Sequence, residues 1–439
     1  MSPLCSGRAS IPRFVAFAVL IAFAGPGVSA QVEIVIPAGD ECATCHVDLD
    51  EMPRDFQPYD VHFKHGLSCV GCHGGDASSD DEEVAMDEDA GFLGVPLTKD
   101  IPAFCGRCHS DLEYMRTFQP TIRTDQESQY HTSGHGRVLA GGDGKVATCV
   151  SCHTAHAILP ASDTRSTVYA RNVPNTCNHC HGNDEYMAGY QLRTGVYDAF
   201  AISVHGKALL EAGDVGAPAC NDCHGNHGAL PPEVTSLVEV CGTCHPNNQR
   251  FFEESPMAGP FADEELHSCI ECHGQHEILD PTDEMVGVGE ESVCMDCHAE
   301  GDEGYAAADS IYQHLRALVT ASDSANTLKK SVVRIGMDDV DIEYLLRDAH
   351  QSLIQARTLV HTFDPAKVGE ETAKGVVNAV AAIELSQSQI EEHSKRRWGF
   401  GLATVFISIL VVALFLKLRD IERGRNAANI PGSHIDMES

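Results

Sequence analysis

The sequence is poor in basic residues. Its 439 residues include 30 lysines and arginines against 64 aspartates and glutamates, which gives a formal net charge of -34 at pH 7. A surface of this charge repels nucleic acid and anionic lipid headgroups, because both carry negative phosphates, and it favours cationic partners. The composition therefore argues against any nucleic-acid partner.

Cysteine is nearly absent outside one short motif. Eighteen of the 19 cysteines lie in nine copies of Cys-x-x-Cys-His, and only Cys5 lies outside them. The motif cysteines are Cys42, Cys45, Cys69, Cys72, Cys105, Cys108, Cys149, Cys152, Cys177, Cys180, Cys220, Cys223, Cys241, Cys244, Cys269, Cys272, Cys294 and Cys297. The histidines that end the motifs are His46, His73, His109, His153, His181, His224, His245, His273 and His298.

This spacing is typical of covalent haem attachment. Two thiols close together in the chain can form thioethers with the two vinyl groups of one porphyrin, and the adjacent histidine can bind the iron. A zinc site, a dithiol redox motif or a disulfide framework could each explain one copy. A zinc protein has no reason to place histidine after every pair, and a disulfide framework has no reason to keep every gap at two residues. The motifs predict nine covalently bound c-type haems, with their iron.

The N-terminal segment has the pattern of a secretory signal. An apolar run, Phe14–Ala24, follows two arginines and precedes Val28-Ser29-Ala30, which has the small-residue spacing of a signal-peptidase site. We predict a signal peptide at residues 1–30, with Cys5 removed along with it. Export fits c-type haem attachment, which resembles a process completed outside the bacterial cytoplasm.

A second apolar run lies near the other end of the sequence. Gly399–Leu416 contains 18 residues without a charge, and Trp398, the only tryptophan, stands at its entrance. This length can cross a bilayer as a helix, although a buried soluble helix is the alternative. Basic residues flank both ends, so the signal peptide decides the orientation. We predict a transmembrane helix at 398–418 in the bacterial inner membrane, a periplasmic haem domain and a cytoplasmic tail at 419–439.

The haem region is too short for a conventional apolar core. Between Gln31 and Glu300, each motif has roughly 30 residues of protein. The porphyrins must then organise the fold. We predict a mainly α protein with extensive loops: a cofactor-organised multihaem cytochrome domain at 31–300, a helical bundle at 301–397 and one C-terminal transmembrane helix.

The haem region also repeats. CVSCHTAHAILP, CNDCHGNHGALPP and CIECHGQHEILDP each carry a second histidine three residues after the motif histidine, and each is followed by a plainer motif. The plainer motifs lead to SGHG, SVHG and ELHS. The pattern indicates duplication of a two-haem module, with the first motif standing alone and the next pair more divergent.

With these repeats the chain resembles the multihaem c-type cytochromes with doubled Cys-x-x-Cys-His motifs. The resemblance covers residues 31–300. It implies that single electrons pass through closely packed haems, most of them ligated by two histidines.

Candidates for the second, distal histidine can be counted directly. His179 is discounted because it lies inside its own motif, where the tether holds it away from the iron. Nine candidates remain for nine irons: His62, His65, His131, His135, His156, His205, His227, His267 and His276. We expect His135, His205 and His267 to be equivalent, since they follow His109, His181 and His245 by 26, 24 and 22 residues.

The region after the last motif has helical spacing instead of cysteine. Apolar residues from Ile342 to Val360 recur at intervals of three and four, which predicts a helix from about 338 to 362. Pro365 opens another helix that can continue directly into the membrane segment. His314, His350 and His361 could reach the last haems, but we favour packing or solvent roles over ligation for each of them.

Two classes of function remain. The first is electron transfer between a membrane b-type cytochrome, or another quinol-oxidising subunit, and soluble or outer-membrane cytochromes. The alternative is an oxidoreductase acting on a small nitrogen or sulfur compound at a five-coordinate haem. Multihaem nitrite, hydroxylamine and tetrathionate enzymes resemble the chain, but it has no Cys-x-x-Cys-Lys, the signature of several of them. A hydroxylamine-oxidising type would keep the histidine. We favour electron transfer and assign no catalytic residue.

Overall fold

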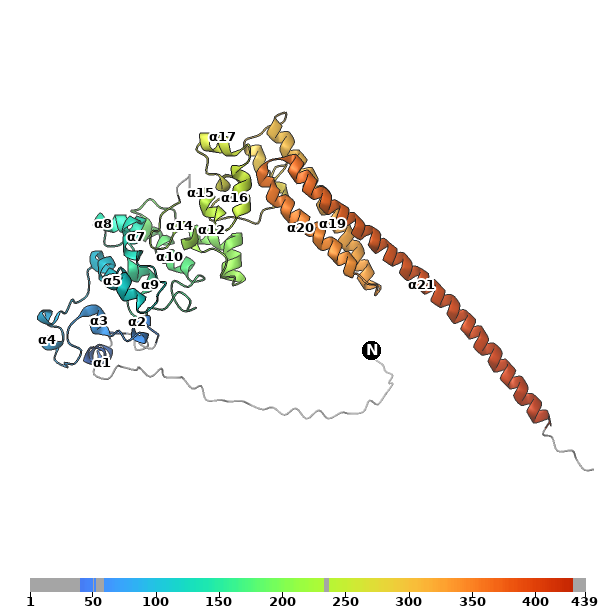
Figure 1. Cartoon of the computed structure of the whole chain (residues 1–439), viewed down its shortest axis with the longest axis horizontal. Helices are drawn as coiled ribbons and strands as arrows, with labels where there is room; N and C mark the ends of the chain where they lie inside the picture. Colours follow the sequence, from blue (N-terminus) through green and yellow to red (C-terminus); the bar gives the residue numbers. More distant parts are fainter. Residues whose placement is uncertain (1–39, 50, 53–58, 233–236, 429–439) are drawn as a thin grey trace, which may run out of the picture. The chain divides into compact units, whose positions relative to one another are not determined.

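The computed structural model describes residues 40–49, 51–52, 59–232 and 237–428. The predicted signal peptide and the last residues of the predicted tail lie outside these ranges. Within them the chain forms helices and loops and no strand (Figure 1), which confirms the mainly α fold with long connections. The chain divides into two compact units, the first ending at Leu97 but also containing Thr154–Leu159, and the second comprising the rest.

The first unit contains short helices that begin at aspartates. Asp40, Asp60 and Asp81 precede three of them, and each carboxylate accepts a hydrogen bond from a backbone N–H of the first turn. The helices are α1 (Glu41–Asp48), α2 (Val61–Lys64), α3 (Cys69–His73) and α4 (Glu82–Ala85). Part of the acidic excess therefore satisfies helix ends.

Short helices also make up the motif-bearing part of the second unit. They are α5 (Ile101–His109), α6 (Leu112–Arg116), α7 (Gln126–Thr132), α8 (Gly134–Ala140), α9 (Cys149–His153), α10 (Val173–His181), α11 (Asp184–Met187), α12 (Val196–Ile202), α13 (Val204–Gly206), α14 (Cys220–His224), α15 (Leu237–Gly242), α16 (Pro246–Glu253), α17 (Ala258–Asp263) and α18 (Cys269–His273). Few apolar side chains are buried among them, and the largest, such as Leu209 and Phe261, are scattered along the chain. This part therefore lacks a conventional apolar core, as the sequence predicts.

The apolar core lies instead in three long helices (Figure 1). α19 (Glu303–Arg334) and α20 (Val340–Leu359) pack along the first half of α21 (Pro365–Ala428). Buried residues of the predicted stripe, including Ile342 and Leu353, face this core, so the predicted helix is confirmed. The core residues are Ile311, Leu315, Leu318, Ala325, Val332, Ile342, Leu346, Ala349, Leu353, Ala356, Val368, Ala379 and Ala382.

Helix α21 continues without a break into the predicted membrane segment. It has 64 residues, and its apolar side chains from Trp398 to Leu418 are exposed. Within the described residues, it is the helix that is long and apolar enough to cross a membrane. The predicted continuation from Pro365 into this segment is confirmed.

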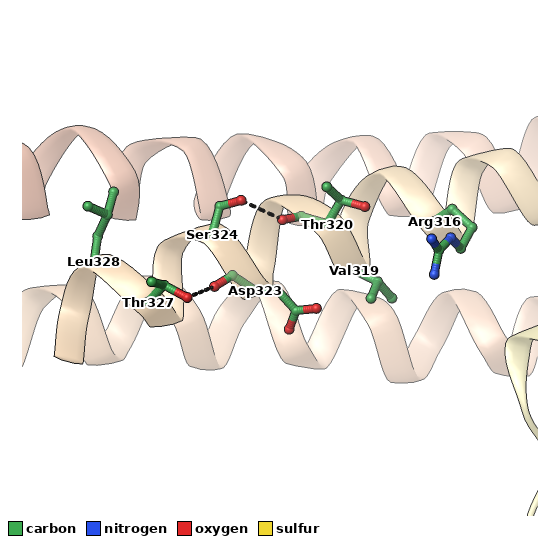
Figure 2. Close-up of a pocket in the computed structure, with 7 residues that line it drawn as sticks. All are labelled: Arg316, Val319, Thr320, Asp323, Ser324, Thr327 and Leu328. Carbon is green, nitrogen blue, oxygen red and sulfur yellow. Dashed lines mark hydrogen bonds between the residues drawn. The ribbon is translucent and has the colours of Figure 1, made fainter. Parts of the chain in front are cut away.

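A shallow groove of about 500 Å³ runs along one face of α19 (Figure 2). Two of its hydroxyls, on Ser324 and Thr327, donate to the carbonyls of Thr320 and Asp323, so they are satisfied within the helix. The groove is lined by Arg316, Val319, Thr320, Asp323, Ser324, Thr327 and Leu328, and none of these is a cysteine or histidine.

Two adjacent valines of α19 test the bundle core. Val332 is fully buried, whereas Val333 is 54% exposed. Val332→Ala should lower the free energy of unfolding of the bundle by about 2 kcal/mol, because it removes buried methyl groups and leaves a cavity. Val333→Ala should change it by less than about 0.5 kcal/mol. Denaturant unfolding followed by far-ultraviolet circular dichroism measures both, and equal effects would contradict this packing.

Candidate haem sites

Seven of the nine attachment motifs lie within α-helices, whereas the seventh extends past the end of α15 at Gly242 and the ninth begins in a 3-10 turn, Val293–Asp296. In α3, α9, α14 and α18 the helix is the five-residue motif itself. Helical residues three and four positions apart share a face, so both sulfurs and the imidazole of one motif project to the same side. This arrangement fits a porphyrin that is bonded through both cysteines and ligated by the histidine.

Six motif histidines lie opposite a second histidine. The ring centroids are separated by 6.4 Å for His73 and His156, 6.0 Å for His181 and His135, 6.1 Å for His153 and His227, 6.3 Å for His245 and His205, 5.9 Å for His224 and His276, and 6.1 Å for His273 and His361. These separations exceed direct van der Waals stacking, in which atoms approach to about 4 Å. Each pair therefore leaves space between its rings.

The space has the size of a metal ion with two imidazole ligands. An imidazole nitrogen binds a transition metal at about 2 Å, and the ring centre lies about 1 Å behind it, so two rings on opposite sides of one ion are about 6 Å apart. Among the residues that the structure describes, no three His, Cys, Asp or Glu side chains converge to hold a metal. The pairs fit axial ligation of haem iron rather than a tetrahedral zinc site.

The opposed histidines come from different repeats. The second histidines of the fourth, sixth and eighth motifs, His156, His227 and His276, lie opposite the motif histidines of the second, fourth and sixth. His135 and His205, which follow the third and fifth motifs, lie opposite the motif histidines of the fifth and seventh. Each of these five pairs therefore joins two repeats.

Backbone hydrogen bonds fix the register of these loops. In each of three repeats, the residue that precedes one histidine donates its backbone N–H to a carbonyl. That carbonyl belongs to the residue two positions after a second histidine. The bonds run from Val61 to Ile158 (2.7 Å), from Gly134 to Ala229 (2.9 Å) and from Val204 to Ile278 (2.8 Å). His62, His135 and His205 therefore occupy equivalent positions in the backbone.

Serine and glycine shape the loops at His135 and His205. Ser133 and Ser203 are fully buried, and their hydroxyls accept the N–H of Gly136 and Gly206 at 2.9 Å. A Cβ at Gly136 would lie 2.0 Å from the carbonyl oxygen of Tyr130. Only glycine fits there, which gives the Ser-x-His-Gly pattern its physical meaning. At His62 the carboxylate of Asp60 takes the place of the serine hydroxyl.

The remaining predicted distal residues lie in other settings. His65 is exposed at the end of α2, and His131 is exposed on α7 with its Nε2 3.8 Å from Glu127. His267 is exposed, and its Nδ1 is 3.0 Å from Glu271.

The third copy of the Ser-x-His-Gly loop departs from the other two. Glu265 and Ser268 replace the serine and the glycine, and both have positive φ, at 54° and 53°. Leu266 donates its N–H to Phe261 rather than to a later repeat. His267 therefore lacks the cap and the register bond that position His135 and His205, although the sequence spacing groups the three together.

His361 is a candidate for which the sequence favoured a packing or solvent role over ligation. It lies in the short turn η7 (Val360–Thr362) between α20 and α21, outside every repeat, so no motif marks it. His314 packs against Gly369, as expected for a packing residue.

Burial favours, in most of the paired imidazoles, the neutral form that a metal ligand requires. Burial lowers the pKa of nine of them: His135, His153, His156, His181, His205, His227, His273, His276 and His361. In His73, His224 and His361 the Nδ1–H donates to a backbone carbonyl, which leaves the Nε2 lone pair for a metal.

Cysteines of consecutive motifs lie close together. Their side chains interact between Cys105 and Cys149, Cys177 and Cys220, and Cys241 and Cys269. At the other steps from one motif to the next, cysteines of the two motifs are also neighbours. Burial and the neighbouring thiols raise the pKa of Cys152, which lies beside Cys177, and of Cys272, which lies beside Cys294, to about 11. The pKa of Cys223 is raised by burial and by Cys241. From the third motif to the ninth, order in space follows order in the chain.

Comparison with known proteins gives one family. Residues 61–182 match the cytochrome c3 family, and this stretch holds four of the nine motifs. No curated protein and no solved structure matches the chain. The family match and the Cys-x-x-Cys-His geometry point to the same cofactor, covalently bound c-type haem.

Two glycines of α8 test how the loop positions His135. Gly136→Ala should displace the loop, because its Cβ meets the Tyr130 carbonyl, and one haem should then lose its low-spin spectrum. Gly134→Ala is the matched control, since its Cβ would lie 3.6 Å from the nearest atom. Absorption and electron paramagnetic resonance (EPR) spectra distinguish the two variants, and identical low-spin spectra would refute this role of Gly136.

Proposed function

We propose that this multihaem c-type cytochrome carries nine covalently bound haems and passes single electrons along them in chain order. When bound, each haem supplies an iron that accepts and releases one electron. The observation that carries the proposal is the closeness of the cysteines of consecutive motifs from the third to the ninth. Cofactors anchored at neighbouring cysteines lie next to one another, as electron transfer between them requires.

The residues around the sites favour transfer over catalysis. At the six motif histidines that face a second imidazole, the two rings would hold an iron from both sides and leave no position for a substrate. Hydrogen bonds from Nδ1 to backbone carbonyls orient the rings and increase the basicity of the ligating nitrogen. The cysteines would set the spacing between neighbouring porphyrins.

We assign the five opposed pairs that join two repeats as the axial ligands of five haems. His62, His65, His131 and His267 remain candidates for three further motif histidines, His46, His109 and His298. Among them His62 is preferred to His65, because it is equivalent to His135 and His205 in the backbone. The offset of two motifs seen for those residues would assign His267 to His298.

The proposed setting is the bacterial inner membrane, with the haem domain in the periplasm. Support comes from α21, which is long and apolar enough to cross a membrane. A membrane b-type cytochrome or another quinol-oxidising subunit is the proposed electron donor. Soluble or outer-membrane cytochromes are the proposed acceptors, and a net charge of -34 favours a basic surface on a soluble partner.

The first test counts haems and their spin states on one sample. The purified, air-oxidised protein should contain nine haems per chain, all low-spin in the low-temperature EPR spectrum. A haem count below nine would refute the proposed number. A high-spin signal equal to one haem and sensitive to nitrite, hydroxylamine or cyanide would replace electron transfer by the alternative, an oxidoreductase with an open iron.

A second test concerns His205. His205→Met should raise the reduction potential of one haem while all attached haems remain, because methionine ligation stabilises ferrous iron. His179→Met, an exposed histidine within a motif, should leave every potential unchanged. A spectroscopic redox titration compares the variants, and an unchanged titration for His205→Met would remove it from the ligand set.

A further inference from the structure

We propose that His361 is the second axial ligand of the haem attached at Cys269 and Cys272. The helical bundle would then complete a haem site instead of only supporting the haem domain. This inference rests on the proposed function, because it assumes that haem is bound at the eighth motif.

The repeats provide no second histidine for His273, the motif histidine of the eighth motif. The second histidine of each even motif from the fourth onward lies opposite the motif histidine of the even motif before it. For the eighth motif, His273 would need a histidine from a tenth motif, and the chain has nine. His361 takes that place, with its ring centroid 6.1 Å from that of His273 and the ring planes 24° apart.

The local structure presents the correct nitrogen of His361. Its Nδ1 lies 2.9 Å from the carbonyl oxygen of Thr358, and a carbonyl can only accept, so Nδ1 carries the hydrogen. Nε2 is then the unprotonated nitrogen that can ligate. The same bond from Nδ1 to a backbone carbonyl is made by His73 and His224, both motif histidines.

Contacts on either side hold the η7 turn against the motif region. Before it, Arg357 donates two hydrogen bonds to the carboxylate of Asp283, at 2.8 and 2.9 Å. After it, the ring of Phe363 packs edge-on against Phe252 of α16 at 6.5 Å. Phe363 has φ of 51°, in the left-handed region that a bulky side chain rarely adopts. Such strain persists where surrounding contacts determine the conformation, often at ligand sites.

Removal of the imidazole tests the assignment. His361→Ala should convert one haem equivalent from low-spin to high-spin, and the reduced protein should bind one more carbon monoxide per chain than wild type. Added imidazole should reverse the spin change by filling the open position. His350→Ala, on an exposed histidine of α20, should behave as wild type.

A second variant covers the case in which His361→Ala fails to accumulate. His361→Met retains a ligand and should raise the potential of a single haem. Full haem content with unchanged spin state and carbon monoxide stoichiometry in His361→Ala, or an unchanged titration in His361→Met, would overturn the proposal. These outcomes differ from failure of the proposed function, which would appear in the wild-type protein as missing haems or an open iron.

Discussion

A Cys-x-x-Cys-His turn supplies one imidazole to an iron and has no second one to give, so the other axial ligand must come from elsewhere in the chain. In the proposed ligation, five of the opposed pairs would take it from another repeat, and the sixth would take it from the helical bundle. None of these six sites would then be completed by its own repeat. Because this region buries few apolar side chains, we expect its folding to be coupled to ligation, as in other small metal-organised domains.

The sequence predicts the attachment turns and most of the paired histidines, because both recur in register. Residue identity is a poor guide to equivalent positions where the backbone hydrogen bonds indicate a different register. His65-Gly66 resembles the His-Gly of the later repeats, yet the register bond from Val61 and the cap from Asp60 place His62 in the equivalent position. A carboxylate can replace a serine hydroxyl as a cap, so the physical role is conserved across the repeats where the residue is not.

The helical bundle is likewise predictable from the sequence only in part. Spacing of three and four residues predicts the helix that ends near His361, and the lack of proline after Pro365 predicts the long helix that follows. Tertiary contacts, such as the hydrogen bond from Arg357 to Asp283, determine instead which residues between α20 and α21 reach the motif region. A single histidine in a connecting turn carries no periodic signal, so only the structure brings His361 beside His273.

The unbroken course of α21 also limits how electrons can enter or leave. The helix rises about 50 Å between Pro365, four residues after His361, and Trp398. If α21 enters the bilayer upright at Trp398, the eighth motif stands at that distance from the membrane surface. A partner confined to the bilayer could not reach it. A donor in the membrane would need an extramembrane domain of comparable height, or a mobile carrier to cover the gap.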